Sequence, residues 1–338
     1  MVQWDLTIGM IFLSQTLIGI LGNFSLLYHY IVLYFTGCRL RSTDLILRHL
    51  TVANSMVILS RGIPGVMVAF GWKGFLNDSG CKFVFYVHRV GRGVSISSTC
   101  LLSIFQAITI SPRNSRWAEL KMKAPKSMEG SIFLCWILHM LVNITVPMNI
   151  ISKWSNKNIT KKKDFIYYSA VFFGKNTGSL HAALLLFPDI VSLGLILWST
   201  GSMVFILYRH KQRVQHIHRN KIYPRSSPET RATQTIVVLV STFVSFYTLS
   251  SIFQVFASVF YDHTSWWLVN TGALTAACFP TVSPFILMSR DSSVFRLCFA
   301  WVPPFSPSQA HVAAFMDSPA NTPAPMEIPS PQQVLGAS

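Results

Sequence analysis

Charged residues are scarce in this sequence, and acidic residues are the scarcest. Charged side chains make up 12% of the 338 residues, which is roughly half the share usual in a soluble domain. Asp and Glu together number only 12, so few carboxylates could act in catalysis. The chain also has no P-loop, no paired dinucleotide-binding glycines, no zinc-type cysteine pairs and no H-E-x-x-H motif. These absences argue against an enzyme, and we expect neither a cofactor nor a metal site.

Long hydrophobic runs dominate the sequence instead. Hydrophobic residues make up 51% of the chain, and a helix needs about 20 mostly apolar residues to cross a bilayer. The runs show no two-residue alternation, which a membrane β-barrel would require. The sequence predicts an all-α membrane protein, a seven-transmembrane-helix bundle with short connections, whose helices lie at residues 6–35, 44–70, 83–110, 131–151, 183–208, 233–260 and 266–289.

The basic residues gather in the loops and indicate an orientation. The connections between the predicted helices are numbered from the N-terminus. The first, third and fifth connections and the C-terminal segment contain 17 Lys and Arg, whereas the second, fourth and sixth connections contain 8. Because such an excess marks the cytoplasmic side, we expect the N-terminus outside and the C-terminus inside the plasma membrane. This distribution explains the net charge of +16 without a nucleic-acid partner, and the lipid bilayer is the expected surrounding.

Several long motifs resemble one receptor family. They include "GCRLRSTDLILRHLTVAN" at 37–54, "HRVGRGVSISSTCLLSIFQAITISPRNSRWAELK" at 88–121, "ALLLFPDIVSLGLILW" at 183–198 and "CFPTVSPFILM" at 278–288. This set, in this order, is similar to the type 1 vomeronasal receptors, which are G-protein-coupled pheromone receptors. The resemblance covers about residues 5–301 and implies that the chain binds small-molecule chemosignals within the helices and activates a heterotrimeric G protein, of the Gi type by family analogy.

The chain departs from this family at one cysteine and differs from the rhodopsin-like receptors at one asparagine. The family pairs Cys81 with a cysteine in the second outer loop, but Tyr168 stands at that place, so we predict no outer disulfide. Asn54 stands where rhodopsin-like receptors keep a sodium-binding Asp, which argues against sodium regulation. The alternatives kept open are a bitter-taste-like chemoreceptor, a relic receptor that no longer functions, and a transporter or channel.

Two arginines and one histidine lie close together inside the third predicted helix. His88, Arg89 and Arg92 are five to nine residues into the third helix, roughly 8–14 Å deep at 1.5 Å per residue. Intramembrane charges normally face the interior of a bundle, and Arg61 and Asp189 lie at comparable depth. One interpretation is a structural ion pair, for which we favour Arg92 with Asp189 and keep Arg89 as the alternative partner. The other is a ligand cavity suited to polar or anionic small molecules such as sulfated steroids.

The sequence also offers further candidate residues. In the ligand interpretation, Arg61, His88, Arg89 and Arg92 are joined by four neighbours, which are Phe85, His139, Asn143 and Phe187. Cys298, just beyond the last helix, is a candidate for palmitoylation. The receptor domain is expected to span residues 1–301, followed by a disordered proline-rich cytoplasmic tail at 302–338.

Asn158, in the sequence "NIT" of the second outer loop, is the expected glycosylation site. Asn158→Gln should increase gel mobility by one glycan step, because the acceptor amide is lost while the loop stays outside. Enzymatic removal of N-glycans should abolish the difference between the two proteins. A shift on Asn77→Gln, with none on Asn158→Gln, would show that the other outer acceptor is the one used.

Overall fold

The computed structural model describes part of the chain, and the description below is confined to it. At several helix ends and in the strands only the backbone is described. The described residues are 2–36, 42–72, 76–111, 118–145, 147, 150–152, 162–164, 168–171, 175–217, 228–259 and 266–290. Asn158, Cys298 and the tail from residue 302 therefore lie outside the described residues.

Seven α-helices run through the described part of the chain, as the sequence predicts. They are α1 (Val2–Phe35), α2 (Ser42–Ala69), α3 (Asp78–Ile110), α4 (Ala118–Val142), α5 (Lys175–Ile217), α6 (Pro228–Val259) and α7 (Trp266–Arg290).

The helices α1, α2, α3, α5 and α7 each contain a described span that is long and apolar enough to cross a membrane. The helices α4 and α6 contain shorter apolar segments, Ser127–Val142 and Gln234–Ser250. Large apolar side chains also lie on the outer surface: Leu21, Phe133 and Phe187 are 66–68% exposed. Such exposure suits lipid and not water, so the chain is a multi-pass membrane protein.

The bounds of two helices, α4 and α5, differ most from the hydrophobic runs. The helix α4 begins at Ala118 and ends at Val142, whereas the apolar run predicted residues 131–151. Its first turns contain Ala, Glu, Leu, Lys and Met, which favour a helix without being apolar throughout. Its end is fixed by Asn143, whose side-chain amide donates to the carbonyl of His139 at 2.8 Å. Likewise α5 extends beyond the predicted 183–208 through polar turns at both ends.

Two helix starts follow local capping chemistry. The Asn77 side chain accepts a hydrogen bond from the Gly80 amide at 2.7 Å and caps α3. An Asn at this position satisfies an amide that the first turn leaves without a partner. The helix α6 begins at Pro228, and proline suits the first helical position because no amide hydrogen is needed there.

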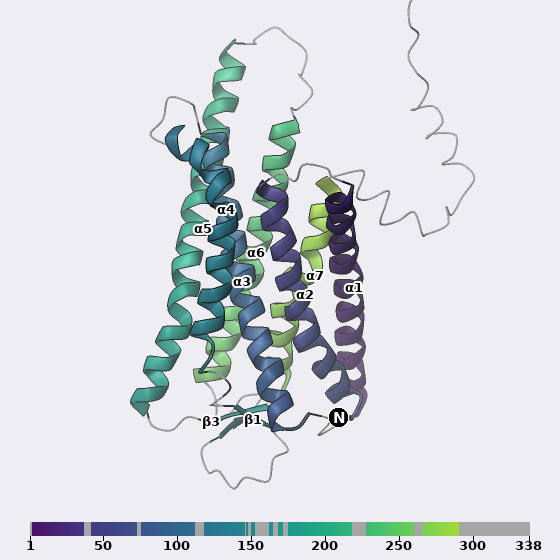
Figure 1. Cartoon of the computed structure of the whole chain (residues 1–338). Helices are drawn as coiled ribbons and strands as arrows, with labels where there is room; N and C mark the ends of the chain where they lie inside the picture. The colour runs from purple at the N-terminus through teal and green to yellow at the C-terminus, as the bar shows by residue number, and fades with distance from the viewer. Residues whose placement is uncertain are drawn as a thin grey trace, which may run out of the picture. The chain divides into compact units, whose positions relative to one another are not determined.

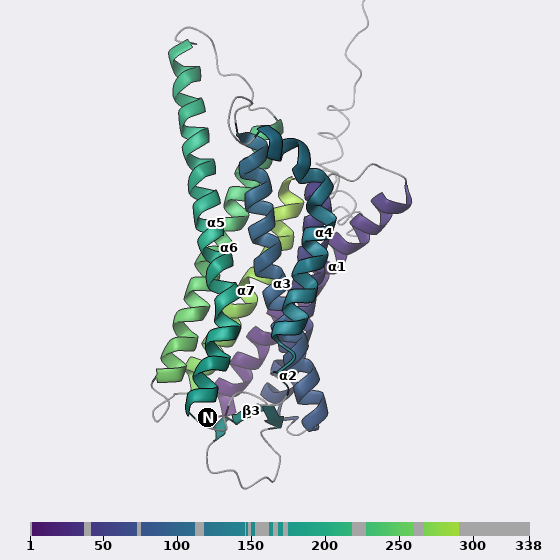
Figure 2. The same cartoon turned by 60° about the vertical axis from the view of Figure 1, so that its left-hand side comes forward.

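The helix α3 is the centre of the bundle. It packs against α2, α4, α5 and α6, while α1 packs against α2 and α7, and α6 packs against α7. Figure 1 and Figure 2 show α3 enclosed by its neighbours in both views. Side chains on nearly every face of α3 are therefore buried, and its polar residues have to find partners within the protein.

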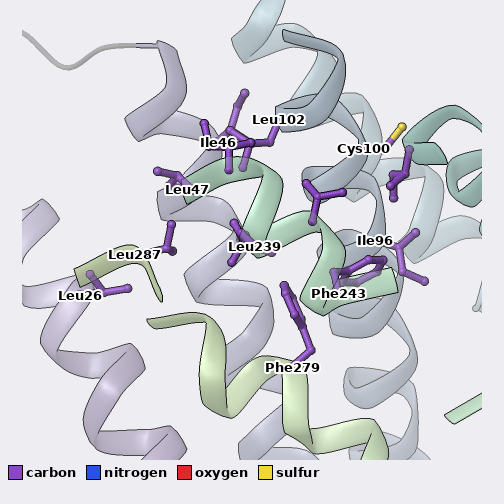
Figure 3. Packing of buried hydrophobic residues seen from close by; sticks show 14 of the residues in the cluster. Leu26, Ile46, Leu47, Ile96, Cys100, Leu102, Leu239, Phe243, Phe279 and Leu287 are labelled. Carbon is purple, nitrogen blue, oxygen red and sulfur yellow. The ribbon is translucent and has the colours of Figure 1, made fainter. Parts of the chain in front are cut away.

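One hydrophobic cluster draws on all seven helices. Figure 3 shows its middle, where Phe243 of α6 meets Phe279 of α7 and Ile96 of α3. The rings of Phe243 and Phe279 lie edge to face, with their centroids 4.7 Å apart. This geometry is the favourable one for aromatic pairs, and it joins α6 to α7 at the base of the site described below.

Three short strands form a sheet that the hydrophobic pattern does not reveal. They are β1 (Ile150–Ser152), β2 (Lys162–Asp164) and β3 (Tyr168–Val171), paired antiparallel in the order β1-β3-β2. Figure 1 shows the sheet at the end of the bundle where α1 begins, and β1 packs against α3. Strands of three or four residues are too short to show a two-residue alternation. Tyr168 itself pairs with Ser152 in this sheet.

The contact between α3 and α4 depends on a glycine. Ser97 of α3 shares a hydrogen bond of 2.8 Å with Nε2 of His139, and the imidazole lies directly on Gly93. Any Cβ at position 93 would overlap this ring. Small residues at such contacts are typical of membrane helices, because they let two helices approach closely enough to hydrogen-bond.

Gly93→Ala should therefore destabilise the receptor by about 1–3 kcal/mol, the usual penalty for overpacking. Gly130→Ala is the matched control on α4, since nothing lies within 4 Å of its added methyl group. The control should keep or raise stability, because alanine favours a helix by about 0.5–1 kcal/mol over glycine. The measurement is the thermal unfolding midpoint in detergent, and equal midpoints for both variants would contradict the packing argument.

Candidate functional site

Three arginines of α2 and α3 lie near one buried imidazole of α3. His88 is 4% exposed, and it interacts electrostatically with Arg61, Arg92 and Arg89. Its Nδ1 atom lies 3.5 Å from the Ser60 hydroxyl of α2. His88 and Arg92 are four residues apart and share a face of α3. The structure thus brings together the four charged or ionisable residues of helices 2 and 3 that the sequence proposes for the ligand site.

Tyr247 lies between Arg92 and Asp189. The Arg92 guanidinium lies over the Tyr247 ring, 4.9 Å from its centroid, and the Tyr247 hydroxyl donates to Oδ2 of Asp189 at 3.0 Å. Among the described side chains no direct ion pair joins Arg92 to Asp189, so the aromatic ring links the two charges. Tyr247 also stacks on Phe243, with ring centroids 5.6 Å apart. One tyrosine of α6 thereby connects α3 with α5.

Polar contacts also join α3 to α4. Nε of Arg89 donates to Oδ1 of Asn143 at 3.3 Å. Asn143 and His139 are each 3% exposed, and His139 interacts electrostatically with both Asp189 and Arg89. These contacts place His139 and Asn143 beside the charged cluster, and they give each of the two residues a structural role.

A second polar junction joins α2, α3 and α7. The side chain of Asn54, 1% exposed, donates to the Ser283 hydroxyl at 2.9 Å and accepts from the Ser95 hydroxyl at 2.8 Å. The neutral amide of Asn54 thus forms a hydrogen bond with each of the two hydroxyls.

Within the searched part of the chain, no group of His, Cys, Asp or Glu is arranged to hold a metal ion.

A cavity of about 40 Å³ opens beside the charged cluster, among α2, α3, α6 and α7. A volume of this size holds about three water molecules. It is lined by Val57, His88, Arg92, Ser95, Ile96, Phe243, Phe246, Tyr247, Ser250, Ala276, Phe279 and Pro280.

Of the eight residues that the sequence proposes for the ligand site, only His88 and Arg92 line this cavity. Phe85 packs its ring against His88, with centroids 6.3 Å apart, and does not line the cavity. Phe187 is 66% exposed and does not line it either. Cys81 is fully buried with its thiol outside any disulfide.

Sequence reasoning did not identify Tyr247 or the aromatic lining from α6. The signal was present in "FVSFYTLSS" at 243–251, where Phe243, Tyr247 and Ser250 recur with helical spacing. That spacing alone cannot separate a cavity lining from ordinary core packing. Only the contact with Arg92 and Asp189 distinguishes Tyr247.

Comparisons with known proteins agree with this architecture. The sequence model of the vomeronasal organ pheromone receptor family matches residues 6–300. Vomeronasal type-1 receptor 4 of Homo sapiens is 59% identical over 294 residues, covering 87% of this chain and 97% of the relative. Vomeronasal type-1 receptor 2 of Homo sapiens is 61% identical over 286 residues, covering 85% and 72%. Vomeronasal type-1 receptor 100 of Rattus norvegicus is 32% identical, covering 87% and 89%.

The solved structure of squid rhodopsin has the same fold. It matches with a TM-score of 0.68 at 12% sequence identity, covering 95% of this chain and 93% of rhodopsin. The seven-helix fold of this chain is therefore the fold of squid rhodopsin. On the family match and these relatives, the chain belongs to the vomeronasal organ pheromone receptor family, as a type 1 vomeronasal receptor.

Proposed function

We propose that this receptor binds its small-molecule chemosignal in the cavity among α3, α6 and α7 and signals through a Gi-type G protein. The observation that carries the proposal is the position of Tyr247. It lines the cavity and at the same time holds Arg92 of α3 and Asp189 of α5. A ligand in this cavity therefore touches a side chain on which the packing of three helices depends.

The lining suits a ligand with a polar end and an apolar body. His88 and Arg92 offer hydrogen-bond donors on one side, while Phe243, Phe246 and Phe279 offer apolar surface on the other. Ligand pockets are typically apolar with a few placed polar groups. Because Phe243, Phe246 and Phe279 line the cavity, a ligand that fills it packs against aromatic rings of α6 and α7 and can displace them.

Displacing a ring gives the ligand a way to shift the receptor between states. A ligand favours one conformation only through its different affinity for the two. Phe243 and Tyr247 stack on one another, and Phe243 packs against Phe279 of α7. Movement of either α6 ring therefore changes how α6 packs against α3, α5 and α7.

The proposed orientation places this cavity nearer the outer surface. The basic loops favour a cytoplasmic position for the ends of α1, α3 and α5 that carry Arg and Lys. The sheet β1–β3 then covers the outer end, where α1 begins. In this orientation we assign glycan to Asn158, palmitate to Cys298 and G-protein contact to the basic second and third inner loops.

Ala276→Phe should block the ligand response, because Ala276 lines the cavity and a phenyl ring would fill it. Cells expressing the receptor with Gi are first screened with a panel of volatile odorants and steroids. For a compound that activates the unmodified receptor, we expect the half-maximal concentration to rise at least about tenfold, equivalent to 1.4 kcal/mol.

Val282→Phe is the matched control, since Val282 lies on the same helix and is 37% exposed. It should respond normally at equal surface expression. An unchanged response in Ala276→Phe would contradict the cavity as the ligand site. A response that persists after pertussis toxin treatment would contradict the Gi assignment.

A second prediction concerns the link through Tyr247. Asp189→Asn and Arg92→Gln should each lower surface expression sharply, because removing one partner leaves a buried charge uncompensated at about 3–5 kcal/mol. The double variant Arg92→Asp with Asp189→Arg should restore part of it, since coupled sites are not additive. The measurement is cell-surface labelling against total receptor.

Tyr247→Phe tests whether Asp189 depends on the Tyr247 hydroxyl or on direct pairing with Arg92. It keeps the ring beneath Arg92 but removes the hydroxyl that Asp189 accepts from, which should lower stability by about 1–3 kcal/mol. Tyr208→Phe is the control, because Tyr208 is 59% exposed on α5. Wild-type unfolding midpoints for Tyr247→Phe would show that Asp189 does not depend on this hydroxyl.

A further inference from the structure

Two prolines lie inside α7, at positions 280 and 284. Proline has no amide hydrogen, so the carbonyl four residues earlier in a helix loses its usual hydrogen-bond donor. In α7 these are the carbonyls of Ala276 and Pro280. Hydrocarbon offers no donors, so a carbonyl freed in this way needs one from a neighbouring helix, from a side chain or from water held inside the protein.

The Pro280 carbonyl receives its donor from α1. Nδ2 of Asn23 donates to it at 2.9 Å, and the Asn23 side chain is fully buried. Nε2 of Gln15, about two turns earlier on α1, donates to the carbonyl of Leu274 at 3.0 Å. Side chains of α1 thus satisfy the α7 carbonyls that they reach, and the hydrogen bond lost at Pro284 is replaced.

The Ala276 carbonyl lies at the wall of the cavity. Ala276 and Pro280 both line the cavity, and residues four apart share one face of a helix. The carbonyl that would bond to an amide at position 280 lies between them on this face. The hydroxyls of Thr275 and Thr281, on the same stretch of α7, donate to other carbonyls. A molecule that occupies the cavity is therefore in a position to supply the missing donor.

Other polar groups of the cavity have the opposite hydrogen-bonding character. The Arg92 guanidinium can only donate. The hydroxyls of Ser95 and Tyr247 already donate to side chains outside the lining. A backbone carbonyl can only accept, so Ala276 complements these groups. A ligand that satisfies both kinds of group has to donate as well as accept.

We propose that the Ala276 carbonyl accepts a hydrogen bond from the chemosignal, and that the receptor therefore prefers alcohols to ketones and ethers of the same skeleton. This inference rests on the proposed ligand site. A hydroxyl group donates to Ala276 and accepts from a group such as Arg92, whereas a ketone or an ether only accepts. A ketone or an ether that displaces water from the cavity leaves the Ala276 carbonyl without a donor, and an unpaired buried acceptor lowers affinity.

The first test compares matched compounds on the purified full-length receptor in detergent. Cyclopentanol, cyclohexanol and menthol are each compared with the corresponding ketone and methyl ether. The ketone is slightly smaller than the alcohol and the ether is larger, so size alone does not produce a preference for the alcohol. Binding is read from the rise in the thermal unfolding midpoint, because a ligand of the folded state stabilises it by mass action. We expect the half-saturating concentration of the alcohols to be at least about tenfold lower.

Two proline variants assign the preference to the carbonyl. Pro280→Ala restores an amide hydrogen that the Ala276 carbonyl can accept, so the preference for alcohols should disappear while ketone binding remains. Pro284→Ala is the matched control on the same helix, because the carbonyl that it affects already accepts from Asn23. It should keep the preference. Pro280→Ser restores the same amide and adds a hydroxyl that can donate to the carbonyl four residues earlier, so it serves if the alanine variant does not fold.

The outcomes separate this inference from the proposed ligand site. Equal half-saturating concentrations for alcohols, ketones and ethers would overturn the inference, and so would a receptor that none of the three alcohols stabilises. A preference that persists in Pro280→Ala or Pro280→Ser would assign the ligand hydroxyl to another acceptor, such as Ser95. Stabilisation by alcohols that survives in Ala276→Phe would instead refute the cavity as the ligand site.

Discussion

The structure depends on the need to satisfy polar groups on α3 without help from water. Hydrocarbon offers no hydrogen bonds, so a polar side chain in a membrane helix has to find its partner in a neighbouring helix. The helix α3 lies at the centre, and its polar residues are buried along much of its length. Ser95 donates a hydrogen bond to Asn54 of α2, Ser97 shares a hydrogen bond with His139 of α4, and the Arg92 guanidinium lies over the Tyr247 ring of α6. These contacts determine which helix lies beside which face of α3.

The charged cluster and the hydrophobic core are two parts of one arrangement. Phe243 belongs to the core and packs against Phe279, yet it also lines the cavity and stacks on Tyr247. A change at the cavity therefore passes directly to the core, because Ile96, Phe243 and Phe279 belong to both. Asn54 joins α2, α3 and α7 through neutral hydrogen bonds beside the cavity, whose lining includes its partner Ser95. The receptor thus combines a neutral polar junction with a group of basic side chains on the same helix, α3.

Much of the fold and part of the polar site could be predicted from the sequence alone. The hydrophobic runs located the seven helices, because a bilayer demands a minimum apolar length. The motif around His88, Arg89 and Arg92 indicated both the family and a polar site in helix 3. The hydrophobic runs did not predict the start of α4, because helix-forming polar residues extend this helix back to Ala118. They did not predict β1–β3 either, because these strands are too short to show a periodicity. Helix propensity and strand pairing do not depend on hydropathy, so a hydrophobic run does not reveal either of them.

The sequence by itself determined the class of protein, the number of helices and which residues bear charge inside the membrane, since each follows from composition within one segment. The tertiary structure alone decided which of these residues meet. Arg92 and Asp189 have opposite charges and comparable depth, but the packing of α6 inserts Tyr247 between them. Phe187 and His139 were equal candidates in the sequence, yet one is exposed on the surface of α5 and the other is buried on Gly93. Rotation of each helix about its axis sets these outcomes, and that rotation is fixed by contacts between segments far apart in the chain.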